Sequence, residues 1–66
     1  MKMSTSEAFE FRKQYDEMKE AGYNEDAIAD AMIGGIGLIN KRKLRRKYLE
    51  ATSIIRKDYA NAVTGV

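Results

Sequence analysis

The chain has 66 residues with a net charge of +2, and it contains no Cys and no His. This composition excludes disulfides, thiol or imidazole catalysis and nearly every zinc site, so we expect no metal and no cofactor. The length predicts one helical domain over residues 1–66. A chain this short buries only roughly 60% of its unfolded surface, so close helix packing or a partner chain must add stability.

The first predicted helix covers residues 4–21. Ser4 and Glu7 have the spacing of a capping box, and Gly22 can adopt the left-handed conformation that ends a helix. Apolar side chains recur at helical spacing along one face, which indicates the buried side. Phe9 lies off that face, either as a partly exposed aromatic side chain or as part of a partner surface. The predicted buried face consists of Ala8, Phe11, Tyr15, Met18 and Gly22.

The second predicted helix is short and covers residues 25–33. Asn24 is a favourable N-cap, two acids follow it where the helix dipole favours them, and Tyr23 can pack on Ile28. Two consecutive glycines then end the helix. The residues that we expect on its buried side are Ala27, Ile28, Ala31 and Met32, with Ala29 at a close helix crossing.

The third predicted helix is the longest and covers residues 40–62, with Asn40 as its N-cap. A narrow apolar stripe along it is a clear amphipathic pattern. Ile39 and Leu44 occupy the positions of a hydrophobic staple, and residues 63–66 are expected to fray. The predicted stripe consists of Leu44, Tyr48, Ala51, Ile55, Tyr59 and Ala62, with Leu49 and Ile54 beside it.

A basic run opens the third helix, where six of the seven residues from 41 to 47 are cationic. The helix macrodipole disfavours each cation at this end by about 0.3–1 kcal/mol. Residues 1–30 carry eight acids and four bases (net −4), and residues 31–66 carry eight bases and two acids (net +6). We expect an anion site for nucleic-acid phosphates. The alternative is that acids of the first two helices neutralise the run within the fold. The candidate contacts are Asn40, Lys41, Arg42, Lys43, Arg45, Arg46 and Lys47.

The glycine-rich turn before this helix has the layout of a helix-turn-helix motif, in which the second helix meets DNA. The fit is partial, because Gly34 and Gly35 stand where the usual pattern has one glycine, and the turn is longer and more apolar than usual. Cations at nearly every position favour phosphate contact over base readout. A generic bend between two helices is the alternative. A P-loop is excluded, because its second glycine, its hydroxyl and its preceding strand are missing.

These patterns predict an all-α, helix-turn-helix-like three-helix bundle that works as a DNA-binding protein, in preference to an RNA-binding one. It would be a regulator or accessory factor of a bacterium, phage or mobile element. The sequence contains no arrangement of a nucleophile and a base, so we do not expect an enzyme. A homodimer would bury apolar surface and add stability. Its candidate surface consists of Phe9, Leu49 and Ile54.

The alternative function is a protein-interaction module or small inhibitor whose basic run binds an acidic protein surface, with no nucleic-acid role. The Gly22-Tyr23 turn among three helices is similar to ubiquitin-associated-type bundles, from which the third helix departs by its length and its basic charge. We expect a cytoplasmic location, because residues 1–7 lack the apolar core of a signal peptide. We expect no membrane partner, because the longest nearly uncharged stretch is too short to span a bilayer.

Overall fold

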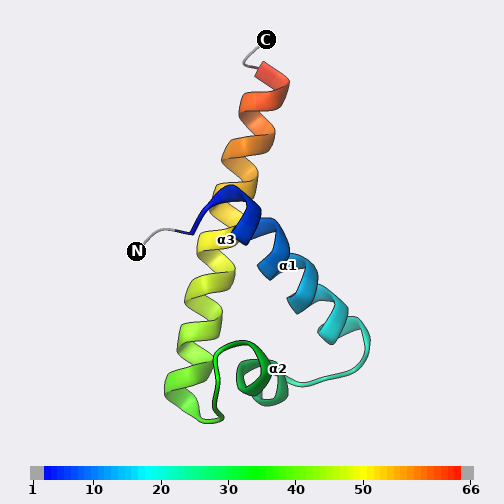
Figure 1. Cartoon of the computed structure of the whole chain (residues 1–66), viewed down its shortest axis with the longest axis vertical. Helices are drawn as coiled ribbons and strands as arrows, with labels where there is room; N and C mark the ends of the chain where they lie inside the picture. Colours follow the sequence, from blue (N-terminus) through cyan, green and yellow to red (C-terminus); the bar gives the residue numbers. More distant parts are fainter. Residues whose placement is uncertain (1–2, 65–66) are drawn as a thin grey trace.

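Three helices follow one another along the chain: α1 (Thr5–Glu20), α2 (Glu25–Met32) and α3 (Leu38–Thr64). The computed structural model describes the backbone of residues 3–64 and the side chains of residues 3–62. α1 crosses α3 at an angle near the middle of α3, and α2 lies across the end at which α3 begins (Figure 1). The predicted all-α three-helix bundle is therefore confirmed.

Both ends of α1 follow from local sequence. The Ser4 hydroxyl accepts a hydrogen bond from the Glu7 N–H at 3.2 Å, and the Glu7 carboxylate accepts one from the Ser4 N–H at 3.3 Å. This pair is the predicted capping box. At the other end the Tyr23 N–H donates to the Met18 carbonyl at 3.0 Å, while Gly22 adopts a φ of 95°. A residue with a side chain rarely adopts that φ, so Gly22 ends the helix as predicted.

α2 is capped by Asn24, whose side-chain oxygen accepts a hydrogen bond from the Ala27 N–H at 2.9 Å. Its buried side is centred on Ile28 and Ala29, neither of which is exposed to solvent. Ala31 was predicted to be buried and is instead exposed. At about 100° per residue it lies on the opposite side of the helix from Ala29, which faces the other two helices.

α3 begins earlier than the sequence patterns predict. The Lys41 N–H donates to the Gly37 carbonyl at 3.0 Å, so Gly37 rather than Asn40 occupies the N-cap position. The φ of Gly37 is 118°, which glycine adopts without steric cost. Ile39 therefore lies in the first turn of α3 with 71% of its surface exposed. The predicted staple between Ile39 and Leu44 is wrong for this reason.

α3 is also longer than the helix that covers it. At 1.5 Å per residue its 27 residues span about 40 Å, whereas the 16 residues of α1 span about 24 Å. The last turns of α3 therefore project beyond the bundle (Figure 1). Tyr59 and Ala62 were predicted to be buried and are exposed there. α3 includes residues 63 and 64, and the rest of the segment predicted to fray, residues 65 and 66, lies outside the described residues.

The core is small, and the molecule is only 14 Å across in its thinnest direction. Among the described residues, Ile28 and Leu44 are the only large side chains that are fully buried. The rings of Tyr15 and Tyr48 contact each other with centroids 4.6 Å apart, and they extend the core between α1 and α3. The other fully buried residues are Ala8, Ala29 and Ala51.

Candidate nucleic-acid interface

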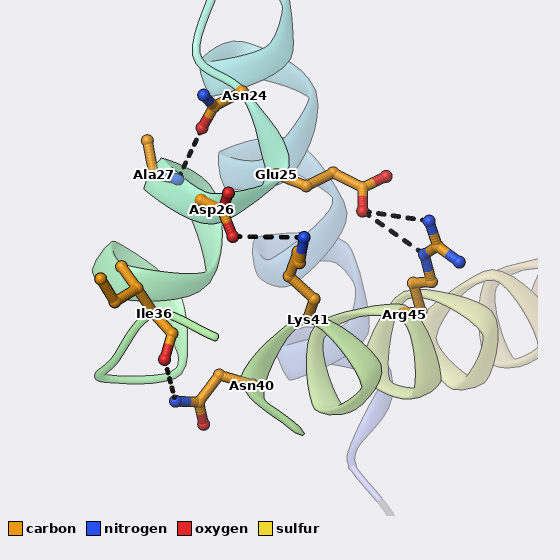
Figure 2. A network of polar contacts seen from close by, with 8 residues as sticks. All are labelled: Asn24, Glu25, Asp26, Ala27, Ile36, Asn40, Lys41 and Arg45. Atoms are coloured by element: carbon orange, nitrogen blue, oxygen red, sulfur yellow. Dashed lines mark hydrogen bonds and ion pairs between the residues drawn. The ribbon is translucent and has the colours of Figure 1, made fainter. Parts of the chain in front are cut away.

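Two cations of the basic run are paired with acids of α2 (Figure 2). The Lys41 Nζ lies 3.4 Å from an Asp26 carboxylate oxygen, and the Arg45 Nη2 lies 3.3 Å from a Glu25 carboxylate oxygen. The Arg45 Nε donates to the same Glu25 oxygen at 3.4 Å. Exposed ion pairs of this kind contribute about 0–1 kcal/mol each. Neutralisation within the fold, the alternative drawn from the sequence, therefore applies to these two cations.

The position of these two acids follows from the start of α2. The Asn24 cap fixes the first turn of the helix, and Glu25 and Asp26 occupy that turn, where the dipole favours negative charge. The turn after α2 then brings the first two turns of α3 beneath them (Figure 2). The side of α3 that carries the paired cations, Lys41 and Arg45, is therefore the side that faces the N-terminus of α2.

The other four cations of the run have no acidic partner among residues 3–62, and all four are exposed. They form two like-charged pairs at i,i+4 spacing, and such pairs destabilise a helix by about 0.2–0.5 kcal/mol each. The sequence has no acid between Asp30 and Glu50. An external anion would relieve this repulsion. We call these residues the free cations: Arg42, Lys43, Arg46 and Lys47.

Asn40 is not presented with the free cations. Its side-chain amide donates to the Ile36 carbonyl at 3.4 Å, so it is turned back to the loop before α3 (Figure 2). Gly35 leaves room for this amide, because a Cβ at that position would lie 2.6 Å from the Asn40 nitrogen. Within the structure, the Asn40 side chain is therefore directed to this turn and not to the surface that carries the free cations.

Sequence reasoning missed the aliphatic side chains that accompany the cations. Ile36, Leu38 and Ile39 are 72%, 61% and 71% exposed. Leu38 also forms one wall of a shallow pocket of about 250 Å³, whose other walls are Lys41, Arg42 and Arg45. Leu38 and Ile39 lie on the surface of α3 because the helix begins at Leu38, while Ile36 stays in the turn before it. The signal available for that start was Gly37, which can serve as an N-cap.

The three residues predicted for a partner surface lie on different parts of the molecule. Phe9 is 49% exposed and Leu49 is 68% exposed, whereas Ile54 is half-buried. Each of them lines a separate shallow pocket. The structure leaves Phe9 and Leu49 accessible, and it does not gather the three residues into one pocket.

Comparisons with protein families, with curated proteins and with solved structures found no match for this chain. Over residues 3–64, no helix combines the length and the apolar character needed to cross a bilayer. Within the described part of the chain, no three carboxylates lie close enough together to hold a metal ion. The features of the chain that bear on function are therefore the charge and the geometry of its own residues.

Proposed function

We propose that this chain is a small DNA-binding protein, a regulator or accessory factor, that contacts phosphates through the free cations. The observation that carries the proposal is that four exposed cations on α3 lack an acidic partner within the described fold. Lys and Arg contacts to phosphate supply most non-specific affinity for DNA and fix the orientation of the protein. An α-helix with its side chains is about 10–12 Å wide, which matches the width of the major groove, about 12 Å.

The arrangement of α2 and α3 supports a docking of the helix-turn-helix kind, with a short helix, a glycine-containing turn and a second helix that presents cations. Glu25 and Asp26 at the start of α2 limit the direction of approach, because they repel phosphates. DNA would therefore meet α3 on the side away from these acids. That side carries the free cations, whereas Lys41 and Arg45 stay paired to α2.

The salt dependence of binding tests how many cations take part. The logarithm of the association constant falls with the logarithm of salt concentration by about 0.9 for each neutralised phosphate. Four free cations predict a slope of about −3.6, and all six cations of the run would give about −5.4. Fluorescence anisotropy of a labelled duplex across a salt series measures this slope. A flat dependence would contradict the proposal.

A charge-reversal variant tests the location of the contact. We expect Arg42→Glu/Arg46→Glu to abolish binding, because it removes two phosphate contacts and introduces two repelling charges. The matched control is Arg56→Glu/Lys57→Glu, which makes the same change of net charge at exposed positions farther along α3. The control should keep most of the affinity, and circular dichroism should show unchanged helix content in both variants. Equal affinity of the two variants would refute a site at the free cations.

A further inference from the structure

We infer that the start of α3 reads thymine, with Leu38 and Ile39 contacting the C5-methyl groups of thymines in the major groove while Arg42 and Arg46 contact adjacent phosphates. This inference rests on the proposed DNA binding and goes beyond it. It names double-stranded DNA that contains A·T pairs as the ligand class, and it gives the aliphatic side chains a role that phosphate contact does not require.

The four residues form one continuous ridge on α3, which we call the outer ridge. Arg42 follows Leu38 by four residues and Ile39 by three, and Arg46 follows Arg42 by four, so Arg42 is a surface neighbour of the other three. Arg42 lies about 160° around the helix from Leu44, which is buried against the other helices. The outer ridge therefore faces away from the core, and all four of its residues are exposed.

The exposure of Leu38 and Ile39 indicates that the ligand has an apolar part as well as an anionic one. These side chains are 61% and 71% exposed. Arg42 and Arg46, which follow them along the outer ridge, make no ion pair within residues 3–62. Among the base edges in the major groove of DNA, thymine presents a methyl group, and aliphatic side chains recognise it. An A-form RNA helix offers no equivalent, because its major groove is too deep and narrow for side chains to read and uracil lacks the methyl group.

The order of the residues along the outer ridge fits this geometry. Leu38 and Ile39 are the first two residues of α3, and the initial residues of a groove-binding helix reach the base edges. Arg42 and Arg46 lie about 6 Å and 12 Å farther along the axis than Leu38. They are therefore placed where such a helix rises toward the phosphates at the edge of the groove.

The test compares two duplexes of the same alternating A·T sequence, one with thymidine and one with deoxyuridine in its place. This exchange removes the methyl groups and leaves the charge and the base pairing intact. We expect the thymidine duplex to bind about fourfold more tightly for each methyl contact, so about fifteenfold for two. A G·C duplex with 5-methylcytosine should likewise bind more tightly than one with cytosine, because the methyl group occupies the corresponding place in the groove.

Variants connect the effect to the outer ridge. Leu38→Ala/Ile39→Ala should lose the preference for thymidine and keep the salt slope, because the free cations remain. Tyr59→Ala, at an equally exposed position on the distal part of α3, should keep both. Circular dichroism verifies that each variant is folded, which is expected since the substituted side chains are mostly exposed.

The outcomes separate this inference from the proposed function. Equal affinity for the thymidine and deoxyuridine duplexes, together with a steep salt dependence, overturns the thymine inference and leaves DNA binding in place. A thymidine preference that persists in Leu38→Ala/Ile39→Ala also overturns it, because other residues would then contact the methyl groups. Absence of binding to any duplex overturns both.

Discussion

Arg12 connects α1 to α3 through a set of contacts made by one side chain. Its guanidinium lies 4.4 Å from the centre of the Tyr48 ring and donates a hydrogen bond of 2.7 Å to the Thr52 hydroxyl. It also pairs with Asp16 on its own helix at 3.4 Å. The Thr52 hydroxyl in turn donates to the Tyr48 carbonyl at 2.8 Å. Arg12 is therefore part of the helix packing, in contrast to the free cations.

Replacing this side chain should weaken the fold. We expect Arg12→Ala to lower the free energy of unfolding by about 1–2 kcal/mol, since it removes a cation–π contact and a hydrogen bond from a charged donor. Urea unfolding followed by circular dichroism measures the change. Lys13→Ala is the control, because Lys13 is exposed on the same helix and its loss should change the stability by less than about 0.5 kcal/mol. Equal effects of the two substitutions would show that Arg12 does not connect the helices.

Tyr15 makes the stability depend on pH in the alkaline range. Burial raises the pKa of Tyr15 above its ordinary value of 10.0, and the nearby Glu25 carboxylate raises it further. The unfolded chain therefore releases this proton at a lower pH than the folded chain does. The contribution of Tyr15 to the free energy of unfolding is complete below pH 10.0, and it is lost as the pH rises through the raised pKa of the folded chain. We expect the free energy of unfolding to fall in this range, and to fall less in Tyr15→Phe. Urea unfolding on either side of the ordinary value measures both, and parallel pH profiles would contradict this account.

The helix ends that the sequence predicted correctly are those set by local contacts. Ser4 and Glu7 are three residues apart, and Asn24 needs only the N–H of Ala27, so neither cap depends on the rest of the fold. The start of α3 was predicted at Asn40, whereas the helix begins directly after Gly37. The turn conformation decides between the two positions, because it directs the Asn40 amide to the Ile36 carbonyl. That conformation includes a φ of 118° at Gly37, and the spacing of residues in the sequence does not reveal a backbone angle.

The extent of burial along α3 and the pairing of its cations are also tertiary properties. Periodicity identified the correct face of the helix, and Leu44 and Ala51 on it are buried. Tyr59 lies on the same stripe, but α1 is too short to cover it. The sequence also located the basic run, whereas the pairing of Arg45 with Glu25 joins residues on different helices. The composition of the basic run alone does not show which of its cations are paired and which are free.

Gly22 provides a test of the α1–α2 connection that depends on backbone conformation alone. A Cβ at this position would have no heavy atom within 4 Å, so a substitution meets no steric obstacle from its surroundings. We expect Gly22→Ala to destabilise the protein by about 1–2 kcal/mol because of the positive φ. Gly22→Asn should cost less, since Asn tolerates left-handed conformations better. Thermal unfolding measures both, and an alanine variant as stable as the original chain would show that the turn relaxes to another conformation.

In the molecule as a whole, as far as the structure describes it, fewer large hydrophobic side chains are fully buried than are exposed to solvent. Two large side chains are fully buried within the described residues, while seven large hydrophobic side chains are exposed. A second copy of the chain that covered part of this surface would add stability through mass action. On the ground of this imbalance we propose the homodimer that the sequence predicts. The exposed side chains are Phe9, Tyr23, Ile36, Leu38, Ile39, Leu49 and Tyr59. Leu38 and Ile39 belong to the outer ridge, so a second copy would cover some of the other five.

A homodimer predicts that the melting temperature rises with protein concentration. Light scattering should give twice the mass of the chain at high concentration. We expect Leu49→Glu to shift the equilibrium toward the monomer, because it places a charge on an exposed apolar position. Lys57→Glu, at another exposed position of α3, should leave the mass unchanged. A monomeric mass with a concentration-independent melting temperature would exclude self-association.

The projecting end of α3 is expected to open to solvent more readily than the rest of the helix. Residues 56–62 belong to a helix whose sides are open to solvent there, so opening of this segment exposes little buried surface and has a low free-energy cost. Its amide hydrogens should exchange with solvent deuterium much faster than those around Leu44. Any partner that packs on this segment would slow the exchange of these amides, whereas DNA bound at the free cations would leave them unchanged. Exchange rates along the single helix α3 would therefore report binding at its two ends independently.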